Sequence, residues 1–332
     1  MSLRHRNIAG LWIAPLLLAV ALLWHFQSAL AAPPPAAPAA SAAAVPEPES
    51  AAAPAPVPLV RRLPNRQAID PVREVVYSES TGVRLTADIY VPEGAGPFPG
   101  VLVVHGGAWR SGSPLQMGHI SQRLARDGYV AVSIRYRLAP EFKFPAQIHD
   151  CKAAVRWMRS HAAQYKIDPE RIGAWGYSAG AHLVALLATT DASAGLEGPN
   201  VPADAPSTRV QAVVAGGAPC DFRPLPEDAL AMAFLLGGSR REVPKVYEQA
   251  SPAAFVSSDD PPMFLYHGSA DHLVPLRNAE RMVVLLKQSG VPCELKILPG
   301  AGHVQAMFNA EAARAAVTFL DEHLKALAPS AK

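Results

Sequence analysis

The chain has 332 residues, half of them hydrophobic, which is enough for one large domain with a substantial core. Its 30 basic and 28 acidic side chains nearly cancel, and this balance argues against nucleic acid as a partner. The three cysteines, Cys151, Cys220 and Cys293, lack the C-x-x-C spacing of a metal or redox centre, so we expect three small buried side chains, with one disulfide bond as the alternative in an oxidising compartment.

Residues 1–31 have the pattern of an export signal. Arg4 and Arg6 give a basic start, residues 8–24 are almost wholly apolar, and the sequence A-L-A at 29–31 is a small-x-small cleavage site. The apolar run also approaches the roughly 17–25 residues of a membrane span, so an uncleaved anchor formed by residues 8–24 is the alternative. We expect export to the periplasm or the extracellular space, with membrane contact only through an uncleaved N-terminal segment.

Residues 32–60 consist almost entirely of Ala and Pro with a few Glu and Ser. This composition cannot build a core and favours an extended, polyproline-like spacer. The composition changes near Arg61, and we expect the folded domain to occupy residues 61–328.

The domain begins with two strand-like runs, at 72–80 and 83–91, which a Thr-Gly pair separates as in an antiparallel hairpin. Short apolar runs without alternation follow, which is typical of strands that are covered on both faces. These runs are 101–104, 129–134, 172–175, 212–215, 263–266 and 295–298.

Helical patterns occupy the intervals between the apolar runs, at 117–126, 145–161, 179–188, 275–288 and 305–324. The alternation predicts an α/β fold: a doubly wound, mostly parallel sheet with the N-terminal antiparallel hairpin at its edge. Residues 221–254 contain no obvious strand and are a candidate for a small cap segment over the site.

The sequence G-Y-S-A-G at 176–180 matches G-x-S-x-G, a motif whose serine lies on a tight turn between a strand and a helix. A strand is predicted before the motif and a helix after it, which is the context that the motif requires. Ser178 is therefore our candidate nucleophile. The sequence H-G-G-A-W at 105–109 directly follows another strand, and we expect the amides of Gly106 and Gly107, with that of Ala179, to form an oxyanion hole.

Two further residues complete a candidate triad. Asp271 follows a predicted strand and can hold an imidazole in one tautomer, while His303 lies between the last strand and the last helix, in a loop that can reach Ser178. Along the chain the three residues follow the order Ser, Asp, His, which is the order found in folds that carry the G-x-S-x-G turn. Asp221 is a weaker candidate for the acid, and Asp259 and Asp260 precede a strand instead of following one.

The other histidines have structural interpretations. We expect His105 to orient its own loop and His182 to be packed or hydrogen-bonded behind the nucleophile. His267 and His272 flank Asp271 without the carboxylate companions of a metal site, so the sequence predicts neither a metal nor a cofactor.

With these motifs, the chain resembles the esterase/lipase branch of the α/β-hydrolase superfamily, and it is similar to the hormone-sensitive-lipase-like and bacterial feruloyl-esterase-like groups. The likeness runs from about residue 73 to 324 and includes Y-R-L-A-P-E at 136–141, Pro145, Asp150, A-S-P at 250–252 and the run at 267–275. Ala108 replaces the third glycine of the HGGG motif, and Gly180-Ala181 replaces a double glycine, so the shape of the acyl pocket differs from that of the lipase-like group.

The resemblance implies a serine carboxylic ester hydrolase that acts through an acyl-enzyme on small esters with short or aromatic acyl groups, including esters on polysaccharides. Kynurenine-formamidase-like enzymes share similar motifs, so hydrolysis of an amide or formamide is an alternative, and a peptidase with the same triad is another. A binding protein on a hydrolase scaffold is the remaining hypothesis, and the intact set of motifs argues against it.

Overall fold

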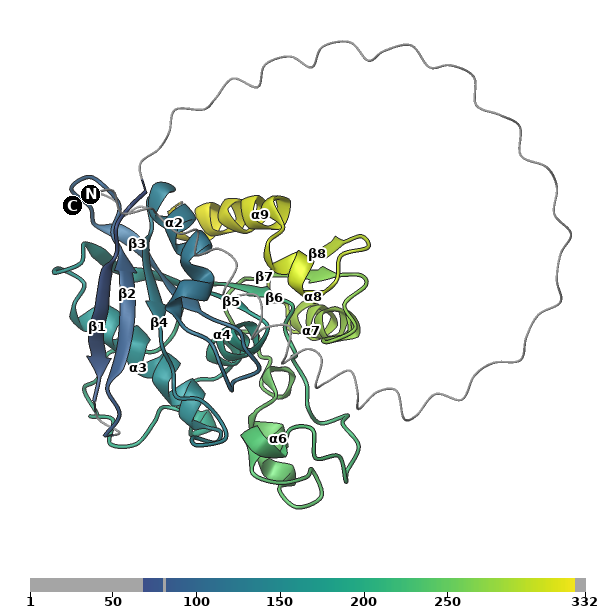
Figure 1. Ribbon diagram of the computed structural model, residues 1–332. Coiled ribbons are helices and arrows are strands. Elements are labelled where there is room, and N and C mark those ends of the chain that lie inside the picture. Colours follow the sequence, from purple (N-terminus) through teal and green to yellow (C-terminus); the bar gives the residue numbers. More distant parts are fainter. Residues whose placement is uncertain (1–67, 80–81, 326–332) are drawn as a thin grey trace, which may run out of the picture. The chain divides into compact units, whose positions relative to one another are not determined.

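A computed structural model describes residues 68–79 and 82–325 (Figure 1). The predicted export signal at 1–31 and the spacer at 32–60 lie outside the described residues. Within the described residues, no helix is both long and apolar enough to cross a bilayer.

One sheet of eight strands forms the centre of the domain, in the order β1-β2-β4-β3-β5-β6-β7-β8. The strands are β1 (Val72–Ser78), β2 (Leu85–Tyr90), β3 (Phe98–Val104), β4 (Val130–Ile134), β5 (Ile167–Tyr177), β6 (Ala212–Gly216), β7 (Met263–Gly268) and β8 (Cys293–Leu298). The first two strands form the predicted antiparallel hairpin at one edge, β2 also runs antiparallel to β4, and all other neighbours are parallel. The sequence prediction of a mostly parallel sheet with an N-terminal hairpin is therefore confirmed.

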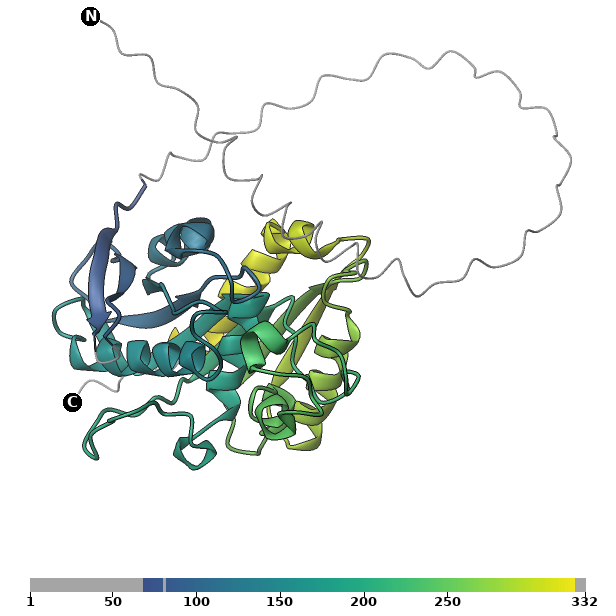
Figure 2. The ribbon, with the colours of Figure 1, turned by 60° about the horizontal axis from the view of Figure 1, so that its bottom comes forward.

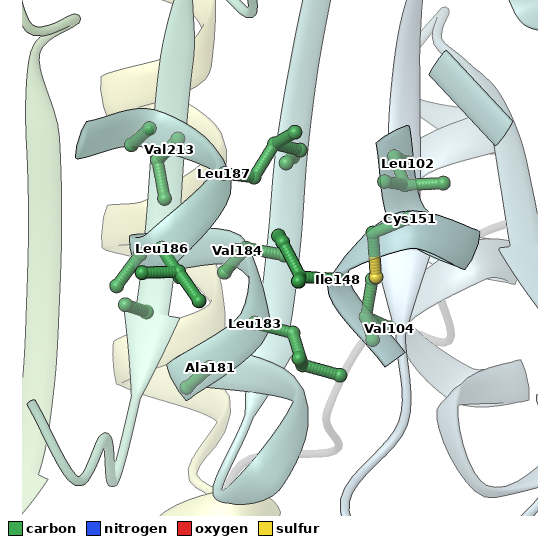
Figure 3. Close-up of a cluster of buried hydrophobic side chains, with 14 of the residues drawn as sticks. Leu102, Val104, Ile148, Cys151, Ala181, Leu183, Val184, Leu186, Leu187 and Val213 are labelled. Atoms are coloured by element: carbon green, nitrogen blue, oxygen red, sulfur yellow. The ribbon is translucent and has the colours of Figure 1, made fainter. Parts of the chain in front are cut away.

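Helices cover both faces of the sheet (Figures 1 and 2). The main ones are α2 (Gly118–Arg126), α3 (Ala146–Ser160), α4 (Ala179–Thr189), α7 (Arg277–Gln288) and α9 (Ala310–Leu320). Neighbouring residues of β3 point to opposite faces: Leu102 packs in the core under α3, α4 and α7, whereas Val103 packs in the core under α2 and α9. Figure 3 shows the first of these cores, in which Ile148 of α3 and Leu183 of α4 meet the sheet.

The last predicted helix, residues 305–324, is wrong as a single element. The structure has α8 (His303–Met307), then α9, and then a π-helical turn at Asp321–Lys325. The break lies at Asn309, whose backbone is extended and whose side chain accepts a hydrogen bond from the amide of Ala312 at 2.8 Å. An Asn that caps a helix in this way starts a new helix, because it satisfies an amide that the first turn leaves free.

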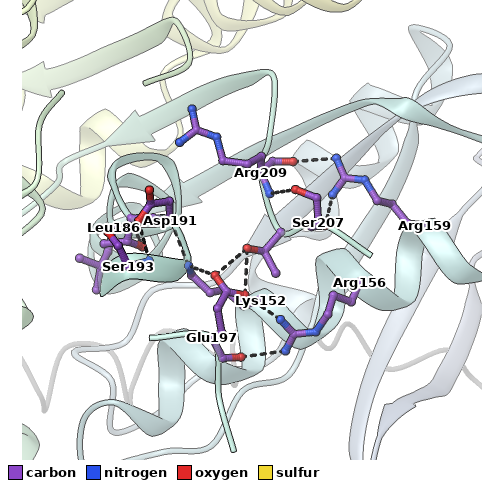
Figure 4. A network of polar contacts seen from close by, with 11 residues as sticks. Lys152, Arg156, Arg159, Leu186, Asp191, Ser193, Glu197, Ser207 and Arg209 are labelled. Atoms are coloured by element: carbon purple, nitrogen blue, oxygen red, sulfur yellow. Dashed lines mark hydrogen bonds and ion pairs between the residues drawn. The ribbon is translucent and has the colours of Figure 1, made fainter. Parts of the chain in front are cut away.

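A buried polar network holds the long connection between α4 and β6 against α3 (Figure 4). The Lys152 ammonium is fully buried and donates to Glu197 Oε1 at 2.5 Å and to the Thr190 carbonyl at 3.0 Å. Arg156 donates to the second oxygen of Glu197 at 2.8 Å. Burying a charge is costly unless it is paired, and these contacts supply the pairs.

The predicted cap segment, residues 221–254, contains two short helices, α5 (Ala233–Leu236) and α6 (Pro244–Gln249), and no strand (green in Figures 1 and 2). Its two ends are joined, because the Phe222 amide donates to Ser251 Oγ at 2.9 Å. Its middle contacts the loop between β4 and α3, where the Phe144 amide donates to the Leu235 carbonyl at 2.8 Å. The segment therefore packs beside loops that leave the carboxyl ends of the strands.

The three cysteines carry free thiols, with Cys151 and Cys220 buried as expected and Cys293 half-buried.

Candidate active site

Ser178 lies on the turn between β5 and α4, as the G-x-S-x-G motif predicts. Its backbone is in an unusual conformation for a residue with a side chain, with φ 54° and ψ −119°. Both motif glycines are required by space: a Cβ on Gly176 would lie 2.2 Å from the Gly180 carbonyl oxygen, and a Cβ on Gly180 would lie 2.1 Å from that of Val104. The turn therefore brings α4 against the end of β3, where the loop that starts at His105 begins.

The loop after β3 carries the candidate oxyanion donors, Gly106 and Gly107. A Cβ on Gly106 would lie 3.4 Å from Ser178 Cβ, so the loop backbone runs beside the serine. In the described part of the chain, the amides of Gly106, Gly107 and Ala179 donate no hydrogen bond to another protein group. Free amides beside the serine are the donors that a developing oxyanion needs.

The loop is held in a strained conformation. Gly107, Ala108 and Trp109 follow one another with φ values of 106°, 51° and 57°. The Trp109 indole donates to His182 Nδ1 at 3.2 Å, and His182 Nε2 lies 2.7 Å from the Ala250 carbonyl. Because Nδ1 accepts, Nε2 carries the proton and donates to Ala250. His182 thus links the loop of Gly106 and Gly107 to the far end of the cap segment, and it is buried and hydrogen-bonded behind Ser178, as the sequence predicted.

His105 lies under the same loop and is fully buried. Its Nδ1 is 2.7 Å from the Gly106 carbonyl, and its ring stacks on Tyr136 with the centroids 4.3 Å apart. The Tyr136 hydroxyl donates to the His105 carbonyl at 3.1 Å. These contacts confirm the prediction that His105 orients its own loop.

The structure brings Asp271 and His303 together. His303 Nδ1 lies 2.6 Å from Asp271 Oδ2. Asp271 follows β7, as predicted, but His303 is the first residue of α8 instead of a loop residue. The loop after β7 and the loop after β8 pack tightly against each other. The Ala270 amide donates to the Ala301 carbonyl at 3.0 Å, and a Cβ on Gly268 would lie 2.1 Å from that carbonyl oxygen.

The Asp271 carboxylate is buried and accepts several hydrogen bonds. Its Oδ1 accepts from the amides of Leu273 and Val274 at 3.0 and 2.8 Å, and its Oδ2 lies 3.3 Å from His267 Nε2. Burial by itself raises the pKa of Asp271, but the hydrogen bonds from His267 and His303 outweigh burial and hold the pKa well below its usual range. The carboxylate is therefore ionised at neutral pH, and His303 Nδ1 donates to it.

Asp221, the alternative acid, has other partners. It accepts three hydrogen bonds from Arg223, two from the guanidinium at 2.8 and 2.9 Å and one from the backbone amide at 3.1 Å, and it lies 3.2 Å from Arg281. Asp259 and Asp260 both accept from Ser257 Oγ. Among the described residues, none of the three forms a hydrogen bond or ion pair with His303, whereas Asp271 does.

The sequence interpretation missed the space at the end of β6, between the strands of Ser178 and Asp271. Gly217 has φ 58°, and a Cβ there would lie 3.0 Å from the Tyr177 hydroxyl and 3.1 Å from His303 Cε1. The absence of a side chain allows Tyr177 and His303 to approach each other across β6. The Gly-Gly pair that ends this strand is the signal that marks the space.

Taken as chemistry, the arrangement supplies a hydroxyl on a tight turn, an imidazole oriented by a carboxylate, and free amides next to the hydroxyl. Nucleophilic acyl transfer uses this set of groups. Within the described residues, no cluster of three or more His, Cys, Asp or Glu side chains could hold a metal ion.

The family model described as BD-FAE matches residues 87–286. The chain belongs to the BD-FAE family. With the doubly wound sheet, this places it in the esterase/lipase part of the α/β-hydrolase superfamily, as its motifs predicted. The BD-FAE match contains Ser178 and Asp271, and His303 lies beyond it.

Other members of this superfamily are similar over most of the domain. A probable carboxylic ester hydrolase of Mycobacterium tuberculosis, LipM, is 35% identical over 237 residues, which cover 67% of this chain and 53% of LipM. The chain thus spans about half the length of the mycobacterial relatives that it matches.

Solved structures match the BD-FAE chain more completely. A truncated carbohydrate esterase from gut microbiota superimposes with a TM-score of 0.71 at 28% identity, covering 78% of this chain and 97% of that one. Esterase 2 of the planctomycete Thermogutta terrifontis superimposes with a TM-score of 0.66 at 28% identity, covering 78% of this chain and 94% of that one.

The buried histidines of the site predict how the stability of the domain depends on pH. Burial lowers the pKa of both His105 and His182 to about 4, whereas a histidine in an unfolded chain titrates near about 6.5. Between these values the unfolded chain binds more protons. The two histidines should therefore make their full contribution to the free energy of unfolding above about pH 6.5. This contribution should fall as the pH drops towards 4.

Thermal melts between pH 7 and 4 measure this dependence. Replacing His182 by Gln keeps a donor for Ala250 and an acceptor for Trp109 but removes the titration, so the melting temperature of this variant should fall less steeply with pH. A melting temperature of the unmodified protein that stays constant from pH 7 to 4.5 would contradict the assignment of neutral, buried imidazoles.

Proposed function

We propose that this protein is an exported serine carboxylesterase that hydrolyses short-chain or aromatic acyl esters through an acyl-enzyme on Ser178. The observations that carry the proposal are the 2.6 Å contact between His303 and the buried Asp271 and the glycine-bounded turn that holds Ser178. Similarity to proteins that are named carboxylic ester hydrolases and esterases supports the same class of reaction.

In the proposed acylation step, Ser178 Oγ attacks the ester carbonyl carbon while His303 Nε2 takes the hydroxyl proton. Asp271 keeps the Nδ1 proton in place and stabilises the imidazolium that forms. The carbonyl oxygen becomes an oxyanion, to which the amides of Gly106, Gly107 and Ala179 donate. When the tetrahedral intermediate collapses, the bond to the alcohol breaks and His303 returns the proton to the departing alcohol oxygen.

In the deacylation step, water takes the place of the alcohol. His303 removes a proton from the water, the resulting hydroxide attacks the acyl carbon, and the Ser178 oxygen leaves with that proton. The products are the carboxylic acid and the free enzyme, and no cofactor is consumed. The reaction needs only the groups that have been described.

A small acyl group suits the cap segment. Two apolar side chains of α5, Leu235 and Leu236, are only 1% and 3% exposed, so they are already used in packing within the domain. The remaining large side chain of α5, Phe234, is half-buried and lies under the Arg110 guanidinium, 4.7 Å from its ring centroid, so α5 does not offer a continuous apolar wall to a long acyl chain. The Thermogutta terrifontis esterase 2 has been solved with propionate and with butyrate bound, which supports short carboxylic acids as the acid product of hydrolysis. The carbohydrate esterase neighbour supports acylated polysaccharides as one source of such esters.

We propose export because of the basic start, the apolar run and the A-L-A site within residues 1–31. Cell fractionation with N-terminal sequencing tests it: we expect a mature chain that begins near Ala32 outside the cytoplasm. An intact Met1 in the membrane fraction would indicate the anchor formed by residues 8–24, and a cytosolic pool that begins at Met1 would refute export.

The triad predicts a clear hierarchy among three variants. Replacing Ser178 by Ala should lower kcat for an activated aryl ester by at least about 10⁴-fold, because the nucleophile is lost. Replacing Asp271 by Asn should cost about 10⁴-fold, because the wrong imidazole tautomer is favoured. Asp221→Asn is the matched control, since it also removes the charge of a buried carboxylate, and it should leave kcat/KM nearly unchanged.

Circular dichroism of the three variants separates loss of chemistry from loss of fold. Damage by Asp221→Asn together with an active Asp271→Asn enzyme would show that the wrong acid has been assigned. An active Ser178→Ala enzyme would refute the nucleophile and leave a different mechanism to be found.

The packing of the cap segment predicts a preference for short acyl chains. Each added CH₂ favours binding by about 0.8 kcal/mol only while apolar surface receives it. We therefore expect kcat/KM for p-nitrophenyl esters to fall between butyrate and long chains. A value that rises through chains of twelve carbons would indicate a lipase pocket, and faster cleavage of a matched anilide than of the ester would favour an amide hydrolase.

A further inference from the structure

The position of His303 depends on contacts from outside its own helix. Helix α8 spans only His303–Met307, which is little more than one turn, and a helix of this length is not stable by itself in water. At its start, Gln305 Oε1 accepts from the Gly302 amide at 2.6 Å. At its end, the ring of His119 from α2 lies 5.2 Å from that of Phe308, the residue that follows α8.

A contact at His303 itself comes from the nucleophile strand. The hydroxyl of Tyr177, the residue before Ser178, donates to the backbone carbonyl of His303. The Tyr177 ring centroid also lies 5.2 Å from that of the His303 imidazole. Tyr177 is only 2% exposed, so bulk water competes little for its hydroxyl. One residue therefore joins the backbone next to the nucleophile to the backbone of the base.

The structure leaves room for this contact at one place. Strand β6 lies between β5 and β7, so Tyr177 reaches α8 across the end of β6. Gly217 occupies that position, and a Cβ there would lie 3.0 Å from the Tyr177 hydroxyl and 3.1 Å from His303 Cε1. A side chain at this position would crowd both the tyrosine and the histidine, and they would have to move by a few tenths of an ångström.

We propose that Tyr177 is a positioning residue, whose hydroxyl fixes the distance between Ser178 and the His303 imidazole by holding the His303 carbonyl. The proposal rests on the function proposed above, because it assumes that His303 is the base. The distance over which the Ser178 proton moves to His303 is then set by the side chain of Tyr177, which touches neither the substrate nor the reacting atoms. Displacement of a reacting group by about 1 Å can cost 100-fold in rate, so a small shift of α8 has a large effect.

The charge state of Tyr177 suits a permanent donor. Burial, together with the nearby Tyr266 and Asp271, raises the pKa of Tyr177 far above its usual value. The hydroxyl therefore keeps its proton throughout the pH range in which an imidazole can act as a base, and the contact with His303 does not titrate.

Tyr177→Phe tests the proposal, and Tyr266→Phe is a matched control. Tyr266 is buried in the same aromatic cluster, 5.8 Å from the Tyr177 ring, but its hydroxyl accepts from the Trp175 indole, at 3.4 Å, and within the described residues it has no hydrogen bond to His303. With a p-nitrophenyl butyrate assay we expect Tyr177→Phe to lower kcat by about 10- to 100-fold with KM within about twofold, because only the approach to the transition state is affected. Tyr266→Phe should leave both constants nearly unchanged.

Melting temperatures of the two variants show whether each loses stability to a similar extent. A Tyr177→Phe enzyme with unchanged kcat would overturn the proposal, as would equal losses of kcat in the two variants, which would indicate general packing of the cluster. Ser178→Ala in the same assay separates the two ideas: if it stays active, the proposed function fails, and if it is inactive while Tyr177→Phe behaves as the unmodified protein, only the positioning role fails.

Gly217→Ala provides a second test that keeps the tyrosine hydroxyl. The added Cβ pushes between Tyr177 and His303, and we expect the same loss of kcat at unchanged KM. Full activity of Gly217→Ala would show that the separation of the two residues does not control the reaction.

Discussion

The site depends on the close approach of α4 to the ends of β3 and β5. Gly180 packs with its Cα against the Val104 carbonyl, and Gly176 packs with its Cα against the first turn of α4, so neither position has room for a side chain. This contact forces the turn at Ser178 into its unusual backbone conformation. It also brings the loop that begins at His105 beside the serine. Steric constraint at the ends of β3 and β5 thus sets both the turn that carries the Ser178 hydroxyl and the place of the free amides.

A second constraint is electrostatic. Burying a carboxylate is costly unless it is hydrogen-bonded, and Asp271 is surrounded by donors from its own loop and from two histidines. The same hydrogen bonds that make burial of the carboxylate tolerable also fix the direction in which it faces His303. Stability and the proposed chemistry therefore use the same contacts, and the loops after β7 and β8 are packed tightly to keep them.

Much of this could be predicted from the sequence because it depends on local pattern. Unbroken apolar runs identify strands covered on both faces, and a serine between two glycines, after a strand and before a helix, identifies the turn. The break at Asn309 could have been read from a capping residue inside the predicted helix, but the apolar period continues across it. By contrast, the contact between Tyr177 and His303 joins residues far apart in the sequence across a third strand. Nothing in the local pattern of Tyr177 distinguishes it from an ordinary core tyrosine.

The central claim is that Ser178 is a nucleophile activated by the His303 and Asp271 pair. Esterase 2 of Thermogutta terrifontis has been solved phosphorylated by paraoxon, which makes the same reagent a suitable probe here. The most direct measurement is the reaction of the purified protein with paraoxon, followed by intact mass and peptide mapping. The account predicts one diethyl phosphoryl group, on Ser178, in parallel with loss of esterase activity, and greatly slowed labelling in Asp271→Asn. Labelling at another residue, or complete loss of activity with Ser178 unmodified, would contradict it.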